Sequence, residues 1–333
     1  MSRVGEVLHG GPIDADEVAR VRDVVMFEEP GLQARLVRFW TLLIMASAIA
    51  TFGLYADSVA TVIGAMIVAP LMLPIMGLAF AIAIADRGGI LRSLLVSLGG
   101  IMTAIVVGYA ISLLMPSQFD PTTNAQIMAR TAPRLVDLMA ALATGLAGAF
   151  AIGRKDVSDT LPGVAIAISL VPPLANVGIL LGAGRTDLAA GSLLLFVTNY
   201  LAIVLTGSLV FGLMGYPTAS LEGSSRRVRG TAVAIVLVMV VAVVAPLGLT
   251  SLEIFRDNAA EANVADETKA WLTGTDYRFV SASATNVRVN VVVAGSGRLP
   301  GESSLVSSLQ GKTFGLPVHV EAIPSTAIDF QTQ

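Results

Sequence analysis

Long apolar runs alternate with short polar connectors along most of this chain. Each run approaches or exceeds the roughly 20 residues that a helix needs to cross about 30 Å of hydrocarbon. The connectors hold the proline, glycine and charged residues that helices inside lipid avoid. The pattern predicts seven transmembrane helices, at residues 36–56, 58–85, 91–115, 135–152, 160–182, 188–214 and 231–252.

Polar segments of different character flank these runs. Residues 1–34 are largely polar, and the valines between Asp14 and Phe27 recur at the spacing of a short amphipathic helix. After residue 252 the pattern becomes that of a soluble module, with the alternation of a half-buried strand. We expect an α/β domain at residues 253–333, with the order helix, strand, strand, helix, strand at residues 258–272, 277–283, 287–293, 305–310 and 316–323.

Lysine and arginine residues beside the predicted helices indicate their orientation, because membrane proteins keep more of them on the cytoplasmic side. With a cytoplasmic N-terminus, the inside connectors hold nine of them: Arg35, Arg38, Arg87, Arg92, Arg154, Lys155, Arg226, Arg227 and Arg229. The outside connectors then hold four: Arg130, Arg134, Arg185 and Arg256. The count predicts a protein of the cell membrane with residues 1–34 in the cytoplasm, 35–252 as the transmembrane domain and 253–333 outside the cytoplasm.

Prolines interrupt two of the predicted helices at corresponding places. One interruption holds Pro70 and Pro74, the other holds Pro172 and Pro173, and a short charged hairpin and a long apolar run follow each. Setting Pro70 against Pro173 matches the two halves of the domain. Because three crossings reverse the direction of the chain, the pattern predicts a 3+3 inverted repeat with two proline-broken helices, followed by one extra helix.

The interruptions matter because proline lacks an N–H group. The carbonyls of the residues before each break, near Met66, Ile67, Ser169 and Leu170, lose their partners. In lipid, each unpaired carbonyl costs several kcal/mol, so these groups are expected to face protein or a wet cavity. Two other interpretations stay open. The breaks are ordinary kinks satisfied by neighbouring helices, or the segment 59–85 forms two re-entrant arms.

Few polar side chains lie inside the apolar runs. Asn176 follows the second interruption by three residues, and Thr198 and Asn199 lie within the sixth run. An asparagine offers both a donor and an acceptor, so Asn176 and Asn199 are the best candidates for contact with a solute or ion. Hydrogen bonding between helices is the competing interpretation. The candidate substrate-binding residues are Pro70, Leu71, Pro74, Ser169, Pro172, Pro173, Asn176, Thr198 and Asn199.

Other residues of the predicted helices have structural interpretations. Asp137 has an arginine three positions before it, which predicts an ion pair at a helix end rather than a proton relay. Gly145 with Gly148, and Gly178 with Gly182, form faces of small residues that let helices approach closely. Such faces also suit contacts in a homo-oligomer.

Composition argues against several classes of function. Charged residues make up 14% of the chain, its mean hydropathy is +0.77, and its formal net charge of −3 does not favour nucleic acid. There is no cysteine, and His9 and His319 both lie outside the predicted helices, so neither a buried Ser–His pair nor a His/Cys metal site is available. The sequence also lacks the full phosphate-binding loop motif, Gly-x-x-x-x-Gly-Lys-Ser/Thr. We expect no enzyme, no cofactor, no metal and no nucleic-acid partner.

Three apolar motifs resemble those of a family of prokaryotic membrane proteins. They are IGAMIVAPLM at residues 63–72, LPGVAIA with VPPL at residues 161–174, and LLLFVTN at residues 193–199. The region from Leu36 to Tyr216 is similar to the family called domain of unknown function 389. The resemblance implies a membrane protein without a settled activity and with a variable soluble appendage. Pro74 and Asn176 stand where many relatives are expected to have small residues.

The residues favour a secondary transporter or channel-like permease for a small solute or ion, which would bind between two opposed proline-broken helices near mid-membrane. The positive ends of the half-helices favour an anion or the carboxylate of a zwitterion. The alternative is a non-transporting membrane scaffold or sensor whose outer α/β domain binds a partner or drives oligomerisation. In both cases we expect membrane lipid around the helices and a homo-oligomer.

Overall fold

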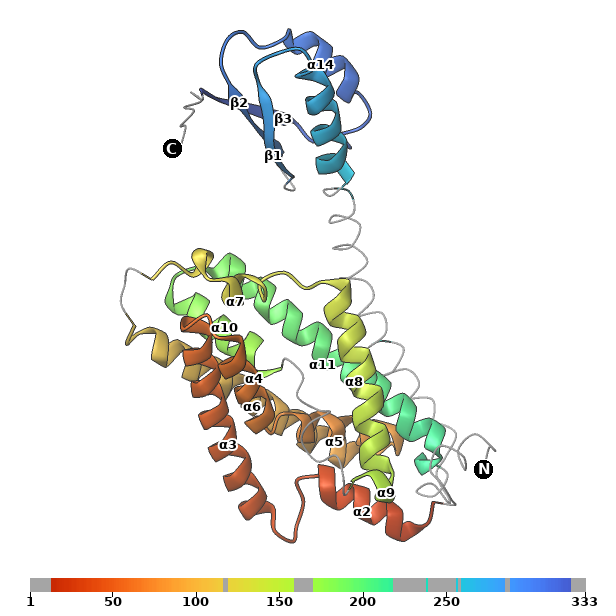
Figure 1. Ribbon diagram of the computed structural model, residues 1–333. Coiled ribbons are helices and arrows are strands. Elements are labelled where there is room, and N and C mark those ends of the chain that lie inside the picture. The colour runs from red at the N-terminus through yellow and green to blue at the C-terminus, as the bar shows by residue number, and fades with distance from the viewer. Residues whose placement is uncertain are drawn as a thin grey trace, which may run out of the picture. The chain divides into compact units, whose positions relative to one another are not determined.

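The computed structural model describes residues 13–115, 119–158, 170–217, 259–284 and 288–324, with Val238 and Arg256, but not the side chains of residues 157 and 158. Two compact units divide the chain, a helical unit within Met1–Ala245 and an α/β unit within Pro246–Gln333 (Figure 1). The predicted helix at residues 231–252 lies outside the described residues, apart from the helical Val238.

Helices make up the described part of the first unit. In chain order they are α2 (Ala15–Val25), α3 (Leu32–Tyr55), α4 (Val59–Val68), α5 (Met72–Ala83), α6 (Arg87–Ser112), the 3-10 helix η1 (Pro121–Thr123), α7 (Ala125–Met128), α8 (Leu135–Gly153), α9 (Lys155–Ser158), α10 (Val171–Gly182) and α11 (Thr186–Met214). Among the described residues, α3, α6, α8 and α11 are long and apolar enough to cross a membrane, and the bent pair α4 and α5 is a fifth candidate. The chain is therefore a mostly helical, multi-pass membrane protein.

Most of the predicted helices have a counterpart with slightly different ends. Four of them correspond to α3, α6, α8 and α11. The predicted helix at residues 58–85 consists of α4 and α5, which are bent by 50° at their junction. Of the predicted helix at residues 160–182, the structure describes residues 170–182, which contain the short α10.

The amphipathic helix predicted near the N-terminus is α2, and it packs onto the other helices. Asp14 accepts a hydrogen bond from the N–H of Glu17 over 2.9 Å and so caps the helix. Val21 and Val25 are buried. The end of α2 comes so close to α5 that a Cβ atom on Gly77 would lie 2.6 Å from the Val25 carbonyl oxygen. Helix α2 is therefore an integral part of the helical unit.

A network of charged residues joins the end of α2 to the turn between α5 and α6. Arg22 donates hydrogen bonds to Glu28 over 2.8 Å and to Asp86 over 2.5 Å, and Arg92 donates to Glu28 over 2.9 Å. Asp86 in turn caps α6. The hydrogen bond from Arg22 lowers the pKa of Glu28 below its ordinary value of 4.5, although partial burial opposes this shift.

Short helices at opposite ends of the unit cap the long helices reciprocally. Arg20 of α2 donates to the carbonyls of Ile152 and Gly153 at the end of α8, over 3.2 and 3.1 Å. Asn124, at the start of α7, donates to the Leu54 carbonyl at the end of α3 over 2.8 Å. Because α3 follows α2 and α8 follows α7, the long helices α3 and α8 run in opposite directions (Figure 1).

The predicted close approach at glycine residues is found between helices of the same chain. A Cβ atom on Gly148 of α8 would lie 2.8 Å from the Met72 Cε atom of α5, and one on Gly108 of α6 would lie 2.6 Å from the Ala175 carbonyl oxygen of α10. Gly178 also packs against the backbone of α6. These small residues therefore form contacts within the unit.

Helices α5 and α10 are a matched pair in the centre of the unit. Each has twelve residues, and α10 begins and ends 99 positions after α5. The first ten residues of α10, and all but two residues of α5, are buried. Each helix ends in the same turn, through Ala85 (φ 59°) and Gly184 (φ 72°), and α6 and α11 then begin at Arg87 and Thr186.

The 99-residue shift between α5 and α10 differs from the alignment that the sequence motif suggested. It sets Pro74 against Pro173, whereas the sequence motif alone set Pro70 against Pro173. It also sets Ser93 of α6 against Ser192 of α11, and both serines are buried. The ion pair predicted for Asp137 is present at the start of α8, where the Arg134 Nε atom lies 3.3 Å from the Asp137 Oδ2 atom.

The α/β unit has the predicted order of elements. Residues 259–271 are helical, followed by β1 (Arg278–Ala284), β2 (Val289–Gly295), α14 (Glu302–Leu309) and β3 (Val318–Pro324). The sheet order is β1-β2-β3, with β1 antiparallel and β3 parallel to β2. The helices cover one face of the sheet (Figure 1). The core between them contains Ala260, Val264, Leu272, Val289, Val291, Val293, Leu305, Leu309 and Leu316.

The charged network predicts how firmly α2 is attached. Substituting Glu28→Gln should release α2 more often, because it removes the carboxylate shared by Arg22 and Arg92. The ion pair of Arg22 with Glu28 is partly exposed to solvent. We therefore expect the free energy that holds α2 in place to fall by about 1 kcal/mol, which corresponds to about fivefold more opening. Because the chain has no cysteine, the labelling rate of Val25→Cys by a maleimide measures this opening. Glu29→Gln, at an exposed neighbouring position, is the matched control.

The same network predicts the pH dependence of this opening. The pKa of Glu28 is lower in the folded chain than in the unfolded chain. Its contribution to the attachment of α2 is therefore present above about pH 4.5 and is lost as the pH falls through the folded pKa. The labelling rates of wild type and Glu28→Gln should therefore converge in acid. Equal rates for the two at pH 7 would contradict the role of Glu28.

Candidate functional site

The first break lies between α4 and α5, at Ala69, Pro70 and Leu71. Pro70 has no N–H for the Met66 carbonyl, and the Leu71 N–H makes no hydrogen bond to the Ile67 carbonyl among the described residues. The chain resumes when the Leu73 N–H donates to the Pro70 carbonyl over 3.2 Å. The break therefore leaves carbonyl groups at the end of α4 without backbone partners.

The residues after this break are buried in apolar surroundings. The side chain of Leu71 is 1% exposed and packs against Gly100 of α6, where a Cβ atom would lie 2.9 Å from the Leu71 Cδ2 atom. Pro74 is the third residue of α5 and so lies inside the helix rather than in the break. A proline in the first turn is compatible with a helix because the N–H groups there have no intrahelical acceptor.

The start of α10 is the corresponding place in the second half. Pro172 and Pro173 lie in the first turn of α10 and are buried. Ser169, a predicted site residue, lies outside the described residues. The structure thus describes the helix after the second predicted break and not the segment before it.

Asn176 joins three segments in the centre of the helical unit. Its amide nitrogen donates to the Ser192 hydroxyl of α11 over 2.9 Å and to the Ile127 carbonyl of α7 over 3.1 Å. The side chain is 0% exposed, and its Oδ1 atom accepts no hydrogen bond from the described residues. The donor half of this amide therefore holds helices together, while the acceptor half has no partner.

A second group of unpaired polar atoms lies farther along α11. The Oδ1 atom of Asn199 and the hydroxyl of Tyr200 are buried and have no partner of acceptable geometry among the described residues. The Ser97 hydroxyl of α6 lies near that of Tyr200 and is likewise unpaired. Thr198 differs, because its hydroxyl bonds to the Leu194 and Leu195 carbonyls of its own helix.

The hydrogen bond between Asn176 and Ser192 gives a reference point for locating Asn199 relative to α10. Helices α10 and α11 are joined by a tight turn and run antiparallel, so equal distances from this bond correspond. Asn199 lies two turns beyond Ser192, about 10 Å along α11. Val171, where α10 begins, lies five residues, or about 7.5 Å, before Asn176. By this estimate Asn199 lies about 3 Å beyond the level at which α10 begins.

The two halves differ in polarity at corresponding positions. The 99-residue shift sets Gly77 against Asn176 and Gly100 against Asn199. At the glycines, neighbouring atoms fill the space that a side chain would need, namely the Val25 carbonyl and side chains that include Leu71. At the asparagines, buried oxygens lack partners. At these two pairs of positions, therefore, a buried amide oxygen without a partner among the described residues replaces the close packing found at the glycines.

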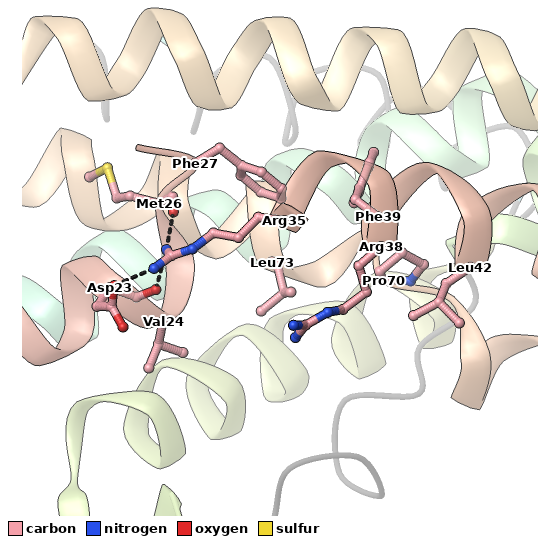
Figure 2. A pocket seen from close by; sticks show the side chains of 10 residues that line it. All are labelled: Asp23, Val24, Met26, Phe27, Arg35, Arg38, Phe39, Leu42, Pro70 and Leu73. Carbon is pink, nitrogen blue, oxygen red and sulfur yellow. Dashed lines mark hydrogen bonds and ion pairs between the residues drawn. The ribbon is translucent and has the colours of Figure 1, made fainter. Parts of the chain in front are cut away.

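A cavity of about 380 Å³ adjoins the first break from the side of α2 and α3 (Figure 2). Among the described residues of its lining, Pro70 is the one predicted site residue, and Leu73 follows it by three positions. The remaining lining residues are Asp23, Val24, Met26, Phe27, Arg35, Arg38, Phe39 and Leu42. The cavity does not contain the polar residues of α10 and α11.

Sequence reasoning missed Ser97, Ser192 and Tyr200. Serine and tyrosine are ordinary in membrane helices, so their type carried no signal. A search for self-similarity at a shift of 99 residues would have found Ser192, because Ser93-Leu94-Leu95 recurs as Ser192-Leu193-Leu194. Ser97 and Tyr200 lie on α6 and α11, far apart in sequence, and only the fold brings their side chains together. Within the described part of the chain, no three His, Asp or Glu side chains are grouped to hold a metal ion.

The contacts of Asn176 predict its contribution to stability. Asn176→Ala leaves the Ser192 hydroxyl and the Ile127 carbonyl without their donor. We expect the free energy of unfolding to fall by about 1–2 kcal/mol, measured by denaturant titration in mixed micelles. The control is Thr206→Val, which removes a hydroxyl that bonds only within its own helix. Equal stability of the two variants would show that the Asn176 contacts contribute nothing.

Comparison with known proteins agrees with the resemblance noted in the sequence. Residues 66–205 match a family described as "Domain of unknown function (DUF389)", a range that contains every predicted site residue. An uncharacterized protein of Methanocaldococcus jannaschii is 33% identical over 174 residues, which are 52% of this chain and 53% of that protein. The chain thus spans about half the length of this curated relative. No solved structure matches. The region from the end of α4 into α11 is thus similar to the DUF389 family.

Proposed function

We propose that this chain is a permease for a small solute or ion, with its binding site where α10 and α11 meet near the second break. The buried amide oxygens of Asn176 and Asn199, which accept no hydrogen bond from the described residues, carry the proposal. A polar atom without a partner costs about 1–3 kcal/mol in a protein interior, and hydrocarbon supplies no alternative partner. Such atoms are retained where water or a solute completes their hydrogen bonds.

An inverted repeat is part of the proposal. One unit would be α2 to α6 and the other α7 to α11, with the predicted helix at residues 231–252 as the extra one. Three observations support it: the common 99-residue shift, the opposite directions of α3 and α8, and the reciprocal capping by Arg20 and Asn124. Helix pairing agrees too, since α5 packs on α6 and α11, and α10 packs on α11 and α6.

The chemistry of the site suggests the class of solute. The asparagine oxygens accept hydrogen bonds, so they suit a donor such as an ammonium or amide group. The N-terminal ends of α5 and α10 carry the partial positive charge of the helix dipole, which suits a carboxylate or another anion, although the prolines in their first turns donate no hydrogen bond. A small zwitterion that carries both groups fits these features best.

The orientation and assembly are also proposals. The excess of arginine in the inner connectors supports a cytoplasmic N-terminus and an α/β unit outside the cytoplasm. A homo-oligomer would have to use surfaces other than the glycine contacts, because Gly108, Gly148 and Gly178 pack within one chain.

Water access to Asn199 tests the site directly. In the cysteine-free chain, we expect Asn199→Cys to react at least about tenfold faster with a membrane-impermeant thiosulfonate than Ala202→Cys, because the reactive thiolate forms where water reaches. Ala202 lies on the same helix and is 0% exposed. Equal, slow labelling of both would mean a dry interior, and the alternative of a packed membrane scaffold would then be preferred.

Flux tests the activity. Proteoliposomes in iso-osmotic glycine, glycolate or urea should swell faster than protein-free liposomes for at least one of these probes. Asn199→Leu should reduce the protein-dependent rate about tenfold, because it removes the oxygen that the solute would bond. Thr206→Val should not. Equal rates for wild type and Asn199→Leu, with folding intact, would refute a site at Asn199.

A further inference from the structure

We propose that the cavity beside the first break binds one anionic membrane phospholipid, with its phosphate at Arg38. The cavity lies between the end of α2, the first turns of α3 and the break at Pro70 (Figure 2). Its volume of about 380 Å³ falls within the about 300–1,000 Å³ of typical ligand pockets. This inference does not depend on the proposed permease activity.

The charges of the lining favour an anion. Among the described residues of the lining, three are charged: Asp23, Arg35 and Arg38. Arg35 is occupied, since it donates to the Asp23 carboxylate and carbonyl and to the Met26 carbonyl. Arg38 makes no hydrogen bond or ion pair with the described residues, and Figure 2 shows no interaction from it to the other lining residues. One positive charge is therefore left for a ligand.

The rest of the lining favours an acyl chain. The other seven residues are apolar: Val24, Met26, Phe27, Phe39, Leu42, Pro70 and Leu73. Val24 and Leu73 are 46% and 38% exposed, so the apolar wall opens at the surface of the helical unit. A soluble anion would leave this wall uncovered, whereas a lipid would cover it with hydrocarbon.

Arg38 lies where the charged first turns of α3 give way to its apolar length. It is the last charged residue of α3, because residues 39–55 carry no charge. Arginine at this boundary is typical of the membrane interface, and its planar guanidinium binds phosphate with two parallel hydrogen bonds. Basic pockets between membrane helices are known to take anionic headgroups. The geometry thus combines a phosphate-binding group with an apolar wall that leads toward Pro70 of the first break.

Native mass spectrometry of the full chain tests the site, with phosphatidylglycerol as the probe and phosphatidylcholine as the neutral comparison. Wild type should retain one phosphatidylglycerol in preference to phosphatidylcholine. Arg38→Gln should bind phosphatidylglycerol about tenfold more weakly, because it removes the charge-assisted contact with the phosphate. Arg87→Gln, at an exposed arginine without an ion pair among the described residues, is the matched control and should bind as wild type does. Leu42→Trp should also weaken binding, because it fills the space for the acyl chain.

Two results would overturn the proposal. If Arg38→Gln and Arg87→Gln weaken binding equally, the lipid is attracted by general surface charge. If glycerol 3-phosphate displaces phosphatidylglycerol at equal concentration, the cavity is a site for a soluble anion and the apolar wall contributes nothing. Thermal unfolding of each variant in neutral detergent checks that the fold is retained.

Discussion

The structure depends on one constraint, the absence of water in hydrocarbon to satisfy backbone and side-chain polar groups. Helices satisfy their own backbones, so α3, α6, α8 and α11 can form the long outer elements. The interrupted helix cannot, and Pro70 leaves the Met66 carbonyl without its usual donor. The short helices α5 and α10 are accordingly kept in the centre, where other helices surround them. The same constraint gives meaning to the unpaired oxygens of Asn176 and Asn199.

Features that depend on local composition could be predicted from the sequence. The apolar runs gave the positions of the long helices, because the thickness of a membrane requires a certain length of hydrophobic chain. The bend between α4 and α5 followed from Pro70, since a missing N–H acts locally. Asn176 and Asn199 stood out because an amide is rare in such surroundings, and the structure buries both.

Features that depend on packing could not be predicted. Pro74 looked like part of the break, yet it lies in the first turn of α5, and a proline before a helix and one just inside it look alike in sequence. The attachment of α2 depends on Asp86, more than sixty positions from Arg22. Ser97 and Tyr200 became part of the site through the contact of α6 with α11. Each of these relations joins residues whose types are unremarkable by themselves.

Reciprocal capping makes the halves dependent on each other during biosynthesis. Arg20 donates to the carbonyl of Ile152, which lies 132 positions later in the chain. The Leu54 carbonyl at the end of α3 accepts from Asn124, which lies 70 positions later. While the first half is being inserted, the Arg20 guanidinium therefore lacks its carbonyl acceptors on α8, and the Leu54 carbonyl has no side-chain donor. The first half is completed only when α8 is in place. A chain released after α6 would lack the partners of Arg20 at one end of the helical unit and of the Leu54 carbonyl at the other. Incompletely packed chains of this kind are substrates of quality-control proteases.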